Sequence, residues 1–197
     1  ALNFTDMQIV QMARKYSLRE RYARQLAYGV ARVFDNDLSV NLSQGLTTTV
    51  GISTDTLVAT RLEKAFAILE SNSVPRDELS LVLHPNVYYK HLFNIAKYYD
   101  ASQFGVKSLP DGAIDFLMGV PVFRTANMAN TASALANYLI HPEALAYAIG
   151  NLPGGVPSGV RLSERYGESL RIKVVADMVY GHKILRTGGG IIIKTAK

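Results

Sequence analysis

The chain has 197 residues, of which 48% are hydrophobic and 19% are charged, and its formal net charge is +5. This length and composition allow a real core in one large domain or two lobes, and they exclude wholesale disorder. The absence of cysteine excludes disulfides, thiolate metal ligands and cysteine nucleophiles, and it fits a reducing compartment.

The charge is unevenly distributed along the chain. Residues 1–45 contain six Lys and Arg against four Asp and Glu, residues 46–159 contain seven against nine, and residues 160–197 contain eight against three. We therefore expect two electrostatically different lobes, with both chain ends in the basic one. The basic excess fits a surface that faces a polyanion, and it equally fits a solvated charged face.

The first predicted element is helical and covers Thr5 to Leu42. Ser17 and Glu20 have the spacing of a capping box, which predicts a short helix, a joint near Ser17 and then a longer helix. The expected apolar stripe consists of Leu18, Tyr22, Leu26, Val30 and Val33. The expected basic face consists of Arg14, Arg21, Arg24 and Arg32. Gly29 costs helix stability, so we expect a close neighbour there.

Between residues 45 and 99 the pattern predicts two strands and two helices. In chain order they cover 45–53, 56–71, 79–83 and 86–99. Thr54 and Asp55 are the expected caps of the first helix. Its expected packed face carries Val58, Leu62, Ala65, Phe66 and Leu69. Pro85 suits the first turn of the second helix.

The remaining pattern predicts short elements separated by turns. Residues 114–124 are typical of a β-hairpin with Gly119 near its bend. The small, polar residues 126–137 predict an exposed insertion, followed by a strand at 138–140 and a short helix from His141 to Ile149. Loops are expected at 103–112 and 151–159, and two or three strands after residue 170. This order favours an α+β fold.

No catalytic or metal-binding constellation is recognisable in the sequence. Lys194 and Thr195 follow a glycine run, but the helix that a phosphate loop requires cannot start there. The four histidines lack metal-ligand spacing, and His84 and His141 each precede a proline, so we expect capping and packing roles for them. Asp111 and Asp115 are expected to be a solvated pair. We therefore expect no enzyme, no cofactor and no metal.

Four ordered segments resemble major capsid proteins of tailed phages. They are Tyr16–Leu26 with Ala31–Asp35, then Asn72–Leu92, then Phe116–Phe123, and finally Ala176–Leu185. Each segment is short, but their succession covers nearly the whole chain.

The resemblance implies the Hong Kong 97 phage fold and a structural role. It implies a spine helix with the first part of a peripheral domain at 1–54, an axial domain at 55–175 and closing peripheral strands at 176–197. It further implies self-association as pentamers and hexamers into an icosahedral virion shell, made in the host bacterial cytoplasm. Expected partners are other capsid, scaffolding or portal proteins and packaged double-stranded DNA, contacted non-specifically; no membrane is expected. Arg14, Arg21, Arg24 and Arg32 are the candidate contacts to a neighbouring subunit or to DNA.

The family's usual N-terminal arm and extended loop have no counterpart in this sequence, which suggests a fragment or a processed product. Three alternatives remain at this point. An encapsulin-like compartment would share the fold and enclose protein cargo, whereas a nucleic-acid-binding module or an unrecognised hydrolase would belong to other functional classes.

Overall fold

The computed structural model describes residues 2–5, 18–92, 116–130, 134–152, 159–165 and 171–197. The chain forms two compact units. The first comprises Ala1–Asp35 with Tyr147–Gly181, and the second comprises Asn36–Ala146 with His182–Lys197. These boundaries differ from the expected ones at 54/55 and 175/176, and the division into peripheral and axial domains stays a prediction.

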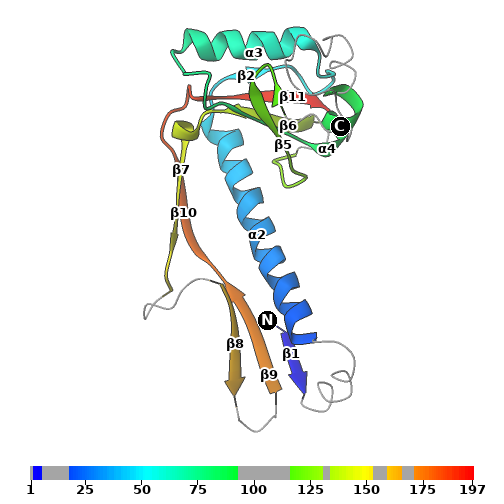
Figure 1. Cartoon of the computed structure of the whole chain (residues 1–197), viewed down its shortest axis with the longest axis vertical. Coiled ribbons are helices and arrows are strands. Elements are labelled where there is room, and N and C mark those ends of the chain that lie inside the picture. The colour runs from blue at the N-terminus through cyan, green and yellow to red at the C-terminus, as the bar shows by residue number, and fades with distance from the viewer. Residues whose placement is uncertain (1, 6–17, 93–115, 131–133, 153–158, 166–170) are drawn as a thin grey trace. The chain divides into compact units, whose positions relative to one another are not determined.

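The first unit combines a helix with a small antiparallel sheet (Figure 1). Helix α2 (Leu18–Gly45) begins directly after the predicted joint at Ser17 and contributes its residues up to Asp35 to this unit. The sheet has the order β1-β9-β8. Its strands are β1 (Leu2–Thr5), β8 (Gly159–Arg165) and β9 (Arg171–Asp177). Strands β7 (Leu145–Gly150) and β10 (Val179–Ile184) pair with each other.

The second unit is built on a mixed six-stranded sheet of order β2-β11-β6-β3-β5-β4. Its strands are β2 (Thr49–Val50), β3 (Ser80–Leu83), β4 (Phe116–Leu117), β5 (Val120–Arg124), β6 (Ala134–Ile140) and β11 (Gly190–Ala196). The strands predicted near residues 45–53, 79–83 and 138–140, the hairpin at 114–124 and the terminal strands are thereby confirmed. The α+β class is confirmed as well.

The predicted exposed insertion at 126–137 is wrong. Residues from Ala134 onward form β6, which lies inside the sheet between β11 and β3. Ala134 to Leu139 are buried. Small and polar residues suggested exposure, but β6 is paired along both edges and its residues contribute to the cores on both faces of the sheet.

Alternate residues of the central strands feed two separate cores. Leu81, Leu135 and Ile191 belong to the larger core, which also contains the buried face of helix α3 (Ala59–Ser71). Figure 1 shows α3 lying along this sheet. Tyr138 and Ile192 point to the other face, where the end of α2 contributes Leu42. The sheet is therefore buried on both faces, and the end of α2 covers the second face through Leu42.

Helix boundaries differ from the prediction where local caps decide them. The N-cap of α3 is Val58, which has no side-chain cap, so Thr54 and Asp55 were wrong as caps. Asp55 instead accepts a hydrogen bond from the Ile52 amide (2.7 Å) and pairs with Arg61 (2.6 Å). Buried Leu62, Ala65, Phe66 and Leu69 confirm the predicted face of α3, whereas Val58 is 40% exposed.

Both segments predicted as α-helices after a His-Pro pair differ in kind from the prediction. Helix α4 (Pro85–Val87) continues as the π-helix η1 (Tyr88–Leu92), and residues 93–99 of the predicted helix lie outside the described part of the chain. The predicted helix to Ile149 is wrong, because the 3-10 turn η2 (Pro142–Ala144) leads directly into β7. β-Branched and aromatic residues after Ala144 favour the strand.

One fully buried amide links the central strands. Asn137 accepts a hydrogen bond from the His84 amide (2.9 Å) and donates to the Ile193 carbonyl (3.1 Å) and the Thr195 hydroxyl (3.1 Å). These bonds join β6 to β11 and to the residue that follows β3. A buried polar side chain is tolerated here because its donors and its acceptor are satisfied.

Two glycines of α2 have opposite surroundings. Among the residues that the structure describes, a Cβ atom at Gly29 would meet none within 4 Å, and the predicted close neighbour is not found there. A Cβ atom at Gly45 would instead collide with the Ile184 side chain. The close approach that requires glycine therefore occurs at the end of α2.

Candidate functional site

The predicted basic face of the spine helix is partly visible on α2. Arg21, Arg24 and Arg32 are exposed and fall within about 80° of the helix circumference at 3.6 residues per turn. Arg14 lies outside the described residues. The structure thus places three of the four arginines on one solvent-facing stripe, and their role as contacts stays a prediction.

The sequence reasoning missed Tyr28, which lies among these arginines. Its side chain is 69% exposed, and its position on the helix falls between those of Arg24 and Arg21. An exposed aromatic ring beside guanidinium groups is a common feature of interfaces, since aromatic residues and Arg are enriched there. The signal was present in the sequence as the spacing Arg21, Arg24, Tyr28, Arg32.

The apolar stripe of α2 follows a different path from the predicted one. Tyr22, Leu26 and Val30 are partly buried, but Val33 is 64% exposed. Phe34 takes its place and makes edge-on ring contacts with Tyr147 and Tyr180 at centroid distances of 5.9 and 4.8 Å. Steps of four residues advance the stripe by about 40° each, so the buried side rotates along the helix and bypasses Val33.

The two His-Pro corners use the predicted capping chemistry. The Nδ1 atom of His84 accepts from the Asn86 amide at 3.2 Å, and the Nδ1 atom of His141 accepts from the Glu143 amide at 3.3 Å. In each ring Nδ1 therefore carries no proton. Burial and the nearby Lys197 charge lower the pKa of His84, which favours this neutral form.

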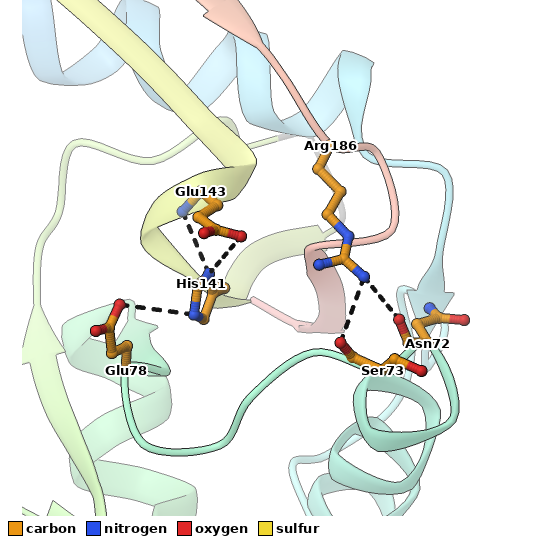
Figure 2. A network of polar contacts seen from close by, with 6 residues as sticks. All are labelled: Asn72, Ser73, Glu78, His141, Glu143 and Arg186. Carbon is orange, nitrogen blue, oxygen red and sulfur yellow. Dashed lines mark hydrogen bonds and ion pairs between the residues drawn. The ribbon is translucent and has the colours of Figure 1, made fainter.

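A polar network surrounds His141 in the second unit, as Figure 2 shows. The ring lies between two exposed carboxylates, with Nε2 at 3.7 Å from Glu78 and Nδ1 at 3.9 Å from Glu143. Close by, Arg186 donates to the carbonyl of Asn72 at 2.7 Å. The His141 contacts thus join the corner after β6 to the segment before β3, and the Arg186 contacts join the turn before β11 to the end of α3, so both act as structural joints.

The described residues contain neither a cluster of metal ligands nor a phosphate loop at the glycine run. Within them, no group of three His, Cys, Asp or Glu is arranged to hold an ion. Lys194 and Thr195 lie on β11, a strand, so no helix N-terminus faces a phosphate there. Asp111 and Asp115 lie outside the described residues. None of the described helices has the length and apolarity to cross a bilayer.

The edge of the six-stranded sheet carries exposed aromatic residues. Phe116 and Phe123 are 54% and 55% exposed. Phe116 pairs with Pro121, and Phe123 follows two residues later on the same face of β5. Apolar rings at a sheet edge are typical of contact surfaces, because an edge strand offers unpaired backbone groups as well.

Comparison with known proteins identifies relatives by structure alone. No family model matches the chain, and no curated protein matches it. A structure from Mycobacterium phage Che8 matches with a TM-score of 0.76 and 23% identity, over 98% of this chain and 68% of that one. The capsid structure of the Cyanophage P-SCSP1u matches with a TM-score of 0.74 and 14% identity, over 100% of this chain and 71% of that one.

A third similar structure comes from a bacterial compartment. The holo-SrpI encapsulin complex from Synechococcus elongatus matches with a TM-score of 0.68 and 12% identity, over 97% of this chain and 70% of that one. The likeness extends over nearly all of the chain in each case. The chain therefore has the α+β fold of the Hong Kong 97 phage type, the fold of tailed-phage major capsid proteins.

Proposed function

We propose that this chain is a structural subunit of the icosahedral shell of a tailed double-stranded DNA phage. The observation that carries the proposal is the fold, which matches a phage capsid structure over 100% of the chain with a TM-score of 0.74. Such a subunit acts by binding copies of itself, so its function requires surfaces and no reaction centre. We infer a structural and non-enzymatic role.

The proposal includes a set of partners and a location. Copies of the chain associate as pentamers and hexamers, and further capsid, scaffolding or portal proteins complete the shell. Packaged double-stranded DNA is contacted non-specifically. The subunit is made in the cytoplasm of the host bacterium and ends in the virion, within a peripheral and axial domain arrangement of the kind expected from the sequence.

The arginine face of α2 is the proposed contact surface. Arg21, Arg24 and Arg32, together with Arg14, bind either the acidic surface of a neighbouring subunit or packaged DNA. Replacing Arg21, Arg24 and Arg32 by glutamine removes three charges while keeping helix-forming side chains. We expect impaired assembly or impaired packaging, and particles with normal yield and normal DNA content would contradict this role.

Electron microscopy of the full gene product tests the shell function directly. Closed icosahedral particles are the expected result over a range of salt concentrations and protein concentrations. Monomers that persist under all of these conditions, and also in cells that express the neighbouring genes, would refute the proposal.

An encapsulin-like shell is the second candidate, because the Synechococcus encapsulin complex has a TM-score of 0.68 to this chain. The two candidates differ in content. Particles isolated from their natural source and treated with nuclease should retain double-stranded DNA if the chain is a phage capsid subunit. Particles that contain a protein cargo and no protected DNA would favour the compartment instead.

A further inference from the structure

The corner after β6 contains the most deeply buried of the four histidines. His141 is only 3% exposed, whereas the other three are partly buried. Its backbone is held on both sides, because its amide donates to the Gly189 carbonyl (2.9 Å) and its carbonyl accepts from the Ala144 amide (3.0 Å). These bonds fix the ring at the junction of β6, η2 and the turn before β11.

The two nitrogen atoms of this ring have different surroundings. The Nδ1 atom accepts from the Glu143 amide at 3.3 Å and thereby caps η2. The Nε2 atom is buried, and no polar atom of the described residues lies within hydrogen-bond distance of it. Buried polar atoms in proteins normally have a partner, and one without a partner lowers stability. The neutral ring is thus satisfied at one nitrogen only.

A carboxylate lies just beyond hydrogen-bond distance of each nitrogen. Glu78, in the segment before β3, is 3.7 Å from Nε2, and the side chain of Glu143 is 3.9 Å from Nδ1. Figure 2 shows the ring between the two. Both carboxylates are exposed, so their side chains are free to adjust. A protonated ring would have an acceptor of opposite charge beside each of its N–H groups.

The cations of the neighbouring elements are directed elsewhere. In the turn before β11 the one charged residue is Arg186, and its guanidinium donates to carbonyls at the end of α3. In the segment before β3, Arg76 donates to the Met118 carbonyl at 2.9 Å, and Asp77 is exposed. Strand β6 carries no charged residue. The charged groups that face the ring among the described residues are therefore the two carboxylates.

We propose that His141 is a proton-operated switch of the corner between β6 and β7. One proton binds to the Nδ1 lone pair, which is the same pair that accepts from the Glu143 amide. The cap of η2 is therefore lost, because Nδ1 becomes a donor that faces another donor. The new Nδ1–H donates to the Glu143 carboxylate, and the Nε2–H donates to Glu78. The corner changes from an amide-capped state to a state held by two ion pairs.

The switch lies where one strand ends and another begins. Glu143 is followed by Ala144, whose carbonyl accepts from the Leu185 amide at 2.9 Å directly after β10. Strand β7 starts at the next residue, Leu145. Release of the Glu143 amide therefore acts on the corner from which β7 departs. The switch belongs to the second unit and is independent of the proposed shell function.

The chain contains a second corner with the same cap and the opposite electrostatic surroundings. The Nδ1 atom of His84 accepts from the Asn86 amide at 3.2 Å, also before a proline-initiated turn. The charge near this ring is the cation Lys197, and burial together with that cation lowers the pKa of His84. The cap at His84 should therefore persist to lower pH than the cap at His141, which makes it an internal reference.

Amide hydrogen exchange of the full chain, resolved to single amides by mass spectrometry, tests the switch. Protection is measured relative to an unstructured chain at the same pH, between about pH 8 and pH 5, where imidazole groups take up a proton. Protection of the Glu143 amide should fall by about fivefold over this range, which corresponds to the loss of one net hydrogen bond. Protection of the Asn86 amide should fall only at lower pH.

Two variants assign the effect to named groups. His141→Asn keeps a capping side chain that does not titrate, so the Glu143 amide should stay equally protected at both ends of the range. Changing Glu78 and Glu143 together to glutamine removes both charges beside the ring. The pH at which protection is lost should then fall by about half a unit, because exposed ion pairs are weak.

A matched control separates these carboxylates from the total charge. Changing Glu63 and Glu70 to glutamine removes two charges from exposed positions of α3 in the same unit and should leave the transition where it was. Circular dichroism verifies that each variant is folded. If His141→Asn does not fold, the double glutamine variant still tests the switch, because it keeps the ring.

The results that would overturn the switch are distinct. One is equal protection of the Glu143 amide at pH 8 and pH 5, and another is loss of protection at the same pH at both corners. An undiminished loss in His141→Asn would show that another group is responsible. Equal shifts of the transition in the two double glutamine variants would overturn the role of Glu78 and Glu143. None of these results depends on whether the gene product forms shells.

Discussion

The buried side-chain amide of Asn137 offers the most decisive test of how the core of the second unit is stabilised. Replacing Asn137 by alanine removes the acceptor for the His84 amide and the donor to the Ile193 carbonyl and the Thr195 hydroxyl. An unsatisfied buried polar group costs about 1 to 3 kcal/mol. Two of the three penalties are reduced, because His84 is only partly buried and the Thr195 hydroxyl can rotate to a new partner. Including the cavity, we expect the free energy of unfolding to fall by about 3 to 5 kcal/mol.

Urea denaturation followed by circular dichroism measures this loss. Asn130→Ala, at an exposed position shortly before the same strand, is the matched control and should change the free energy of unfolding by less than about 0.5 kcal/mol. Asn137→Asp keeps the volume but replaces the donating amide by an accepting carboxylate, so it should be strongly destabilised at neutral pH. A loss below about 1 kcal/mol in Asn137→Ala would refute the reasoning, as would a stable aspartate variant.

Three further predictions follow from contacts described above. Gly29→Ala should stabilise the chain by about 0.5 to 1 kcal/mol. Gly45→Ala should destabilise it by about 1 to 3 kcal/mol, because the new Cβ atom meets Ile184. Equal shifts of the urea midpoint in the two variants would contradict this. Burial raises the pKa of Tyr138 in the folded state, so the unfolded state loses the phenol proton first as pH rises. The free energy of unfolding should therefore fall above about pH 10, and it should fall less in Tyr138→Phe. The pKa of His84 is lowered in the folded state, so stability should fall as pH drops below about 6.5. His84→Asn keeps a capping side chain that does not titrate. If thermal melts of this variant and of the original chain show the same dependence on acid pH, the assignment to His84 is refuted.

Elements with a strong local signal could be predicted from the sequence. The helical spacing around Leu26 predicted α2, and the buried positions Leu62 and Leu69 of α3 followed from the same periodicity. The histidine caps were predictable too, because a histidine before a proline stands at a helix start where an acceptor is needed. These features depend on residues within one or two turns of each other.

Features that depend on distant partners could not be predicted. The strand β6 was mistaken for an exposed insertion because Ala134 and Asn137 suggest solvent, and only its neighbours β11 and β3 make that composition appropriate. The register of the small sheet has the same origin, since the sequence shows alternation in β9 but not the pairing of Arg165 with Arg171. The rotation of the apolar stripe past Val33 became evident only with Phe34 against its aromatic partners.

The position of the last strand has a consequence for the order of events during synthesis. Strand β11, residues Gly190–Ala196, lies between β2 and β6, and it pairs with both. Until β11 has been synthesised, β2 and β6 lack the strand that joins them, and the larger core lacks Ile191 and Ile193. The second unit can therefore complete its sheet only when the end of this segment has emerged. The surfaces that this sheet presents to neighbouring copies are therefore complete only after β11 has paired with β2 and β6.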